Sequence, residues 1–240
     1  MGFFDFSDST NEQLFFEECK TPAQTQLFGE TIEKYHSYVK YVNPPQRRLN
    51  WNVYETKSGN HVGAIGLSSC VLAIAARDSW IGWDKDDRIS HSNNVANNYR
   101  FCLIQNNITI PNVGSMTLKL LRKHGRVRWK EKYGDELVLL ETFVQPKIEG
   151  NDENQRNGAV YLADNWILVG ETMGNSISKA PLLLWKKEDS PRGELARTDP
   201  EAAIKKYAVA SERFHITTSE KKLVFVKPLV KNWKKILIKN

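Results

Sequence analysis

The chain has 240 residues, of which 40% are hydrophobic and 26% charged, and its formal net charge is +6. This length is sufficient for a full hydrophobic core, so we expect one large domain with appendages. No stretch approaches the ~18 apolar residues of a membrane span, and the N-terminus lacks the basic region of a secretory signal. We therefore expect a cytoplasmic protein without membrane contact.

The cysteines argue against a disulfide framework and against a zinc site. Cys19, Cys70 and Cys102 are an odd number without a C-x-x-C spacing, and the last two lie in apolar runs. Such residues are typical of reduced thiols in a hydrophobic core. We expect no structural metal.

Positive charge is concentrated in two places. Residues 221–240 contain seven lysines and no acidic residue, so the preceding 220 residues carry a net charge of about −1. A second basic cluster lies in the middle of the chain: Lys119, Arg122, Lys123, Arg126, Arg128, Lys130 and Lys132. Such clusters attract polyanions, although a basic run is also typical of a solvated face. We expect contact with nucleic acid, DNA in preference to RNA, and treat residues 231–240 as a basic tail.

The N-terminal part is predicted to be an arm followed by a helix and a hairpin. Residues 1–27 mix phenylalanines with acidic residues and are predicted to form an acidic aromatic arm that docks on a partner or on the core. A helical pattern runs from Leu27 to Tyr38 and ends before two consecutive prolines. Two alternating segments, Leu49–Glu55 and His61–Leu72, flank a Ser-Gly-Asn turn and predict an antiparallel hairpin.

The next segment places two tryptophans beside a charged pair. Trp80 and Trp83 must bury much surface, and Arg77 directly precedes Asp78. One interpretation is a core plug in which the two charges pair with each other, and the other is the wall of a substrate site. The sequence leaves both interpretations open.

A strand, a turn and a helix start supply the best candidate for a ligand site. A polar segment from Asp84 to Asn98 is predicted to be helical, with Asp84 as its cap. It leads into an apolar strand, Arg100–Ile104, and a second short strand is expected at Ile108–Ile110. Together these elements predict a buried strand that delivers the chain to a helix start.

That helix is predicted to begin with Asn112 as its N-cap. Gly114 and Ser115 are small, so the unpaired N–H groups of the first turn are open to an anion such as a phosphate. The alternative is that small residues merely let the helix pack closely on its strand.

The second half of the chain predicts alternating strands and helices. A hinge is expected at Trp129–Gly134, followed by the most strand-like run of the chain, Leu137–Val144. A short helix at 158–166 and a strand at 167–172 come after a polar loop, and a final strand, Leu223–Leu229, precedes the basic tail. This alternation favours an α/β layer structure.

Glu141 is the one charge in its apolar strand. A carboxylate in such a place is usually paired or at the end of the strand. A role in a functional site is the alternative.

Several short motifs follow one another from about residue 35 to the C-terminus. They are residues 77–83 (RDSWIGW), 98–101 (NYRF), 112–115 (NVGS), 140–144 (LETFV), 161–166 (YLADNW), 170–172 (GET) and 226–229 (VKPL). This series resembles the domain family of the Druantia anti-phage component DruA, which is also found beside mobile elements. The chain departs from the family pattern at Gln105-Asn106, at Val160 and at Gly174–Ser176. The resemblance implies a protein partner in a defence or mobile-element system.

The order of elements is distantly similar to that of the GNAT acyltransferases and, through them, to the phage Mom proteins that modify adenine in DNA. This resemblance implies an α/β fold with a mixed central sheet flanked by helices, formed by residues 28–230 as a single domain. In GNAT enzymes the strand before the central helix separates from its neighbour, and the start of that helix binds the pyrophosphate of acyl-CoA. A tyrosine on the next helix protonates the leaving thiolate, and Tyr161 occupies that place here.

We therefore predict a GNAT-like acyltransferase that modifies a nucleobase or another nucleic-acid amine, with acetyl-CoA or another acyl-CoA as cofactor. Tyr161 is the predicted general acid, and Glu141 or Asp78 is the predicted proton acceptor. The residues predicted to bind the cofactor are Ile110, Asn112, Val113, Gly114 and Ser115. The residues predicted to bind the substrate are Arg77, Trp80, Trp83, Asn98, Arg100 and Asn165. The alternative is a non-catalytic module that binds nucleic acid in anti-phage defence or in a mobile element.

Overall fold

The computed structural model describes residues 12–36, 47–146, 157–178, 185, 188–207, 215–218 and 220–238. The chain divides into two compact units, one formed by residues 1–171 with 223–240 and the other by residues 172–222. The second unit falls inside the range 28–230 that the sequence predicts to be one domain. Within the described ranges, every helix is too short or too polar to cross a membrane.

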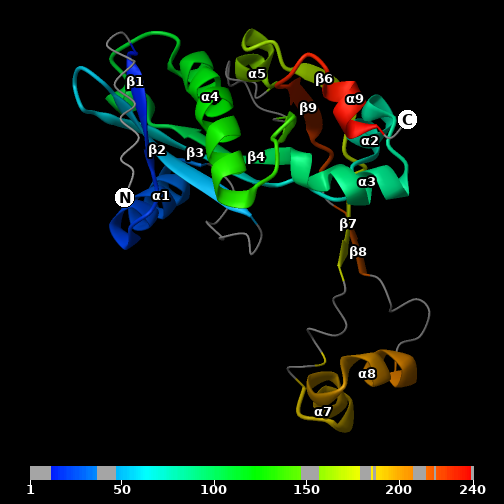
Figure 1. Ribbon diagram of the computed structural model, residues 1–240. Helices are drawn as coiled ribbons and strands as arrows, with labels where there is room; N and C mark the ends of the chain where they lie inside the picture. Colours follow the sequence, from blue (N-terminus) through cyan, green and yellow to red (C-terminus); the bar gives the residue numbers. More distant parts are fainter. Residues whose placement is uncertain are drawn as a thin grey trace. The chain divides into compact units, whose positions relative to one another are not determined.

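The first unit is built on a seven-stranded mixed sheet with the strand order β1-β2-β3-β4-β5-β9-β6 (Figure 1). The strands are β1 (Leu14–Glu18), β2 (Arg48–Glu55), β3 (His61–Ser69), β4 (Val95–Leu103), β5 (Leu139–Val144), β6 (Ile167–Glu171) and β9 (Leu223–Pro228). All neighbouring strands are antiparallel except β4 and β5, which are parallel. The predicted α/β class with a mixed central sheet is therefore confirmed, as is the hairpin of β2 and β3.

Helices cover both faces of this sheet. They are α1 (Pro22–Tyr35), α2 (Ala75–Ile81), α3 (Lys85–His91), α4 (Val113–Tyr133), α5 (Ala159–Ala163) and α9 (Trp233–Leu237). Successive side chains of a strand point to opposite faces. In β3, Ala64 packs with Phe28 of α1, whereas Ile65 packs with Leu118 of α4. The helices α1 and α4 therefore lie on opposite faces (Figure 1).

The predicted arm contributes a strand to the sheet. Residues 14–18 form the edge strand β1, because Leu14 is 1% exposed in the core and Phe16 packs against the same cluster. Residues 1–11 of the predicted arm lie outside the described residues.

Two predicted elements around β4 differ from the structure. The helix expected from Asp84 to Asn98 covers only residues 85–91, because Val95 is already buried in β4, although Asp84 does cap it through a hydrogen bond from the Asp87 N–H. The prediction of a strand at Ile108–Ile110 is wrong. The Thr109 N–H donates to Oε1 of Glu55 (2.6 Å) rather than to a neighbouring strand.

The prediction of a hinge at Trp129–Gly134 is also wrong, since α4 continues to Tyr133. The Trp129 side chain is fully buried, and its indole N–H donates to the carbonyl oxygen of Asn93 (3.1 Å). The helix ends only at Gly134, whose φ of 80° is the left-handed conformation typical of a C-terminal glycine.

The strands β4 and β5 separate at a bulge. They pair over three positions only, ending at Asn97 opposite Glu141. At the next residues β4 shifts register against β3, because Gly66 pairs with Arg100 and Leu67 with Asn98, which leaves Tyr99 as the extra residue. A bulge of this kind bends its strand. We infer that the bulge directs the second half of β4 away from β5.

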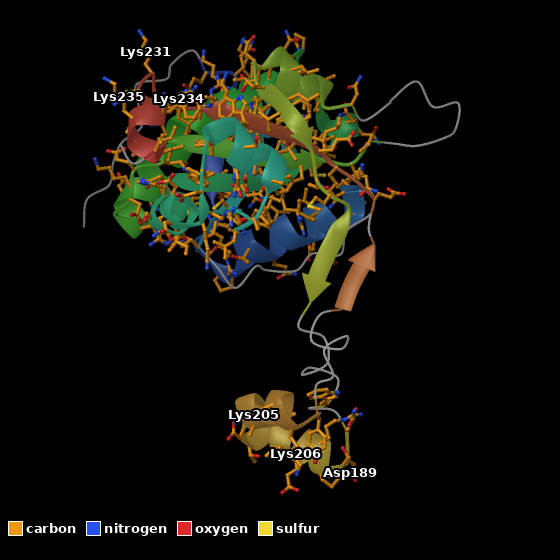
Figure 2. The ribbon with its side chains drawn as sticks, turned by 90° about the vertical axis from the view of Figure 1, so that its right-hand side faces the viewer. Asp189, Lys205, Lys206, Lys231, Lys234 and Lys235 are labelled. Carbon is orange, nitrogen blue, oxygen red and sulfur yellow. The ribbon has the colours of Figure 1, made fainter. Side chains whose placement is uncertain are left out.

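The described residues of the second unit include a two-stranded ribbon and two helices. The ribbon pairs β7 (Asn175–Ser178) with β8 (His215–Thr218), and the helices are α7 (Pro191–Thr198) and α8 (Pro200–Tyr207). Trp185, Ala196 and Ala203 form its small core. Lys205 and Lys206 are exposed in the last turn of α8 (Figure 2).

The bulge depends on a glycine in the neighbouring strand. A Cβ atom at Gly66 would lie 2.6 Å from Cε1 of Tyr99, so we expect Gly66→Ala to destabilise the fold by about 1–3 kcal/mol through overpacking. Urea denaturation measures this free energy. The same Cβ atom would lie 2.8 Å from Oδ1 of Asn50, which accepts from the Tyr99 hydroxyl. In a Tyr99→Ala background the change should therefore cost less, because the clashing ring is gone and the Asn50 side chain is released from it. Equal costs in both backgrounds would contradict the role of Gly66.

Candidate functional site

A cavity of about 510 Å³ lies where β4 and β5 separate. Its walls come from the second half of β4, the end of β5, the start of α5 and the end of α1. Phe101 and Cys102 both line it, although they point to opposite faces of the sheet. The cavity is therefore bordered by residues from both layers of helices.

Three buried polar side chains form the floor of this cavity. The Tyr161 hydroxyl donates to Oδ1 of Asn98 (2.9 Å). The Thr142 hydroxyl lies 3.0 Å from the main-chain oxygen of Asn98 and 3.4 Å from the Tyr161 hydroxyl. The structure thus brings together Asn98, which the sequence predicts to bind the substrate, and Tyr161, which it predicts to be catalytic. Thr142 joins them, although the sequence analysis does not predict it as a site residue.

Tyr161 is held in place by aromatic neighbours and by its helix. Its ring contacts Phe101, Trp166 and Phe225 at centroid distances of 6.0, 5.0 and 5.9 Å. A helix as short as α5 is not stable by itself. Asp164, which follows α5, forms an ion pair with Arg122 of α4 and accepts from the Trp166 indole N–H (2.9 Å). These contacts fix the position of Tyr161 against the sheet.

The start of α4 lies beside the cavity wall. Asn112 is the N-cap, as predicted, but its φ is 59° and its side chain makes no capping hydrogen bond. A Cβ atom at Gly114 would lie 2.7 Å from Cγ2 of Val160 and 3.8 Å from Cδ1 of Leu103, and both of these residues line the cavity. Gly114 is therefore required for close packing, mainly against α5, while the first-turn amides receive no side-chain cap from Asn112.

The other residues predicted to bind the cofactor at this helix start make contacts within the protein. Val113 is 4% exposed in the core and Ile110 packs against the same cluster. The Ser115 hydroxyl donates to the main-chain oxygen of Asn112 (3.1 Å).

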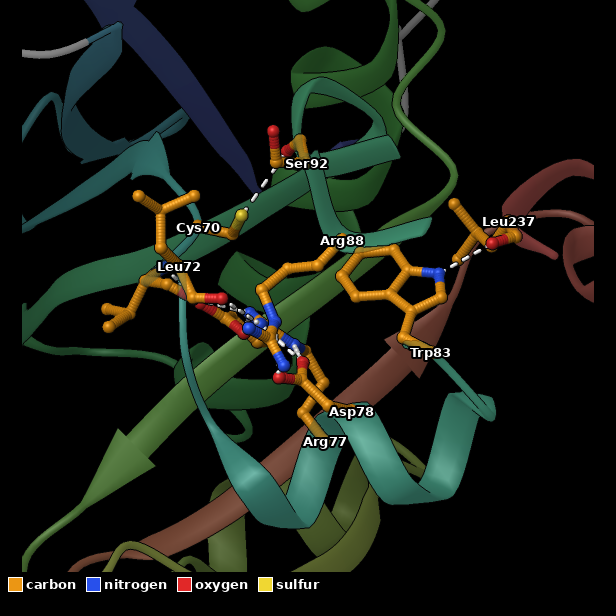
Figure 3. A network of polar contacts seen from close by, with 10 residues as sticks. Cys70, Leu72, Arg77, Asp78, Trp83, Arg88, Ser92 and Leu237 are labelled. Atoms are coloured by element: carbon orange, nitrogen blue, oxygen red, sulfur yellow. Dashed lines mark hydrogen bonds and ion pairs between the residues drawn. The ribbon is translucent and has the colours of Figure 1, made fainter. Parts of the chain in front are cut away.

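Arg77 is the centre of a buried ion network (Figure 3). Its side chain is fully buried and makes five hydrogen bonds, which equals its number of N–H donors. The acceptors are Oδ1 of Asp78, Oε2 of Glu141 and the main-chain oxygens of Val71 and Leu72. Arg77 thus has no donor left for a substrate.

Both predicted proton acceptors belong to this network. Oδ2 of Asp78 also accepts from Nε of Arg88 (2.8 Å), and Oε1 of Glu141 accepts from the Val71 N–H (2.8 Å). Burial raises the pKa of the Glu141 carboxyl, although the Arg77 guanidinium opposes that shift. Neither carboxylate lines the cavity at β4 and β5. The contacts match the structural interpretation of these charges.

Trp80 and Trp83 pack against the C-terminal helix. The Trp80 ring stacks on Trp233 with a centroid distance of 4.5 Å and an interplanar angle of 4°. Trp83 is 7% exposed, and its indole N–H donates to the main-chain oxygen of Leu237 (2.5 Å) (Figure 3). This arrangement matches the core plug rather than a substrate wall.

Cys70 lies in the same hydrophobic cluster as Trp83 and Leu237. Burial raises the pKa of its thiol to about 12, so the thiol stays protonated and donates to the Ser92 main-chain oxygen (3.3 Å).

The remaining predicted substrate residues lie apart from the floor of the cavity. NH1 of Arg100 donates to the Tyr99 main-chain oxygen (2.8 Å), and its guanidinium lies 5.1 Å from the centroid of the Tyr99 ring. Asn165 is exposed, with a φ of 56°, and its main-chain oxygen accepts from Nζ of Lys227 (3.0 Å). The structure does not join them to Tyr161.

The basic cluster of α4 is largely neutralised. Four of its seven residues form ion pairs: Arg122 with Asp164, Lys123 with Glu12, Arg128 with Glu18 and Glu131, and Lys130 with Glu136. By contrast, Lys231, Lys234 and Lys235 are exposed around α9 and form no ion pair with any described residue (Figure 2). Among the described residues, α9 and the segment before it thus carry exposed lysines without ion pairs, whereas four of the seven basic residues of α4 are paired.

Thr142 is the residue of the floor that sequence reasoning missed. It follows Glu141 directly, so the two side chains point to opposite faces of β5. The alternation of this strand was a usable signal: if Glu141 faces one layer, its neighbour must face the other.

We expect Asp78→Asn to destabilise the protein by about 3–5 kcal/mol, because it removes one of the two counter-charges of the fully buried Arg77 and the ion-pair partner of the partly exposed Arg88. Denaturant unfolding measures the loss. The matched control is Asp84→Asn at the exposed cap of α3, which should change stability by less than about 0.5 kcal/mol, since asparagine caps equally well. A wild-type stability for Asp78→Asn would contradict the structural role.

Two of the solved structures that are similar to this chain are as follows. A crystal structure described as a candidate acetyltransferase from Sphaerobacter thermophilus DSM 20745 has a TM-score of 0.36 and 8% identity, over 90% of this chain and 92% of that one. A GNAT family acetyltransferase from Elizabethkingia anophelis with acetyl-CoA bound has a TM-score of 0.37 and 10% identity, over 90% and 99%. Neither likeness is close enough to support a conclusion about activity.

No curated protein matches the chain. A family model described as Druantia protein DruA matches residues 9–178, which is well over half of the chain. This range contains the ion network, the separated strands and Tyr161. The chain belongs to the Druantia protein DruA family.

Proposed function

We propose that this protein is an acyl-CoA-dependent acyltransferase whose acceptor is an amine of a nucleic acid. The observation that carries the proposal is the cavity between β4 and β5, which has the Tyr161 hydroxyl in its floor. A concave site that combines apolar side chains with convergent polar groups can bind a small molecule.

The residues around the cavity fit an acyl-CoA. Beyond Asn97 the strand β4 has no partner in β5, and the proposal places the pantetheine arm along this edge of β4. The main-chain oxygens of Asn98, Tyr99 and Arg100 already accept hydrogen bonds from side chains, so the arm would use main-chain groups further along the strand. Phe101, Leu103 and Val144 give apolar wall surface for its methylenes. The first-turn amides of α4, beside Val160 and without a cap from Asn112, suit a phosphate group.

The floor supplies the chemistry that a thioester requires. Acyl transfer from a thioester releases a thiolate, and a phenol within hydrogen-bond reach can protonate it. Tyr161 is the only member of the floor whose side chain carries an acidic proton suited to that step, since Asn98 is an amide and Thr142 an alcohol. Because Glu141 and Asp78 are committed to Arg77, the proposal gives them no part in proton transfer.

Calorimetric titration with acetyl-CoA and with CoA tests the proposal. We expect heat of binding with both, and we expect Ala159→Phe to weaken binding at least about tenfold, because Ala159 is exposed and lines the cavity. Ala163→Phe is the matched control, since Ala163 is an exposed alanine of the same helix outside the cavity lining. A folded protein that gives no heat with either compound would remove the acyltransferase proposal.

The second candidate is a non-catalytic nucleic-acid-binding module of anti-phage defence or of a mobile element. It is favoured by Lys231, Lys234 and Lys235, which are exposed without ion-pair partners in the described part of the chain. The stack of Trp233 on Trp80 fixes their helix to the body of the unit. Phosphate groups bound by such lysines release counterions. This surface also serves the first proposal as the place where an acceptor strand is held.

Duplex DNA binding measured over a range of salt concentrations tests this surface. Exchanging Lys231, Lys234 and Lys235 for glutamine should weaken binding and reduce the slope of log K against log salt by about 2 to 3, since each phosphate contact contributes about 0.9. The control variant exchanges Lys123, Lys130 and Lys132 for glutamine. These lysines already contact Glu12, Glu136 and the main-chain oxygen of Arg48, respectively. Equal effects of the two triple variants would show that only net charge matters.

A further inference from the structure

The Thr142 hydroxyl lies within reach of two acceptors but has one proton to give. Its Oγ1 is 3.0 Å from the main-chain oxygen of Asn98 and 3.4 Å from the Tyr161 hydroxyl oxygen. The shorter distance favours the Asn98 carbonyl while Tyr161 is neutral. Rotation about one bond is enough to turn the proton to Tyr161.

The Asn98 side chain has no such choice. Its Nδ2 donates to the main-chain oxygens of Gly66 in β3 (3.0 Å) and of Arg100 in β4 (2.9 Å), which pair with each other next to the bulge. These two bonds fix the amide, so Oδ1 must face the Tyr161 hydroxyl, which donates to it (2.9 Å). The bulge that separates β4 from β5 therefore also orients Tyr161.

The three side chains are almost fully buried. Thr142 is 2% exposed, Asn98 3% and Tyr161 6%. With little water to compete, each hydrogen bond here has more influence on the orientation of a hydroxyl than it would on the surface.

We infer that Asn98 and Thr142 are positioning residues for Tyr161. Asn98 holds the hydroxyl at the floor of the cavity, and Thr142 becomes the donor to the Tyr161 oxygen once that oxygen has lost its proton. The inference rests on the proposed acyltransferase function for its chemical step, but the orientation of Tyr161 is measurable without any cofactor.

The proton balance is simple. As the acceptor amine forms a C–N bond to the acyl carbon and the C–S bond of the thioester breaks, the O–H bond of Tyr161 breaks and an S–H bond forms. This leaves a thiol, a phenolate and an acylated nitrogen that still carries one proton too many. The Thr142 proton turns from the Asn98 carbonyl to this phenolate and stabilises its charge, as a donor aimed at developing charge does. The proton that the acceptor nitrogen loses returns to Tyr161 through water, and no oxidant or metal is required.

The test compares Thr142→Val, Thr142→Ser and Thr117→Val in the full chain. Thr117 is the matched control, because it is a fully buried threonine whose hydroxyl likewise donates to a main-chain oxygen, that of Val113 (2.7 Å). Tyrosine labelled with carbon-13 at Cζ reports the surroundings of each phenol oxygen by NMR, and loss of one signal in Tyr161→Phe assigns the Tyr161 resonance. We expect that resonance to move in Thr142→Val and to stay in place in Thr142→Ser and Thr117→Val.

Turnover of acetyl-CoA, followed as thiol release in the presence of DNA, gives the second measurement. We expect Thr142→Val to lower kcat by about 10²-fold with KM nearly unchanged, Thr142→Ser to restore it, and Thr117→Val to leave it unchanged. An unmoved Tyr161 resonance in Thr142→Val, or an equal loss of kcat in Thr117→Val, would overturn the positioning role. If the resonance moves as expected while acetyl-CoA neither binds nor reacts, the orientation of Tyr161 is supported and the proposed function fails.

Discussion

One extra residue in β4 governs the rest of this structure. Tyr99 interrupts the register with β3, and from that point β4 has no partner in β5. Leaving strand edges unpaired inside a domain is costly unless something else uses them. The cost is limited here by Asn98, whose amide bonds two of the main-chain oxygens beside the bulge. The part of β4 beyond this point lines the cavity, which is why we place the functional site there.

A second constraint keeps the separation from spreading along the sheet. Arg77 joins the segment after β3 to β5, since it binds the main-chain oxygens of Val71 and Leu72 and the carboxylate of Glu141. Glu141 pairs with Asn97 at the last position of the parallel ladder. The buried ion network therefore clamps the sheet at the point where β4 and β5 begin to separate. Its charges balance, because Arg77 and Arg88 face Asp78 and Glu141.

The sequence predicted most of the elements but only half of the site. Strands such as Leu139–Val144 and Leu223–Pro228 were visible as apolar runs, and Asn112 was visible as a helix start. The bulge at Tyr99 could not be predicted, because it depends on how the residues of β4 pair with those of β3. It leaves no pattern in the sequence of either strand. The role of Glu141 could not be decided from the sequence for the same reason. A carboxylate in an apolar strand gives the same sequence pattern whether it faces an arginine or a substrate. Residues 77 and 141 are 64 positions apart, and only the fold brings them within 2.6 Å.

The adjacent residues Glu141 and Thr142 connect the two regions. They point to opposite faces of β5, one into the ion network and the other into the floor of the cavity. The same strand is held from its other side by β9, which pairs Val226 with Glu141 and Phe225 with Thr142. Phe225 also stacks on Tyr161. Since β9 lies beyond residues 9–178, the position of Tyr161 depends on a strand outside the segment that identifies the family. The ion network, β9 and the bulge thus act on one strand pair, and together they determine where the Tyr161 hydroxyl points.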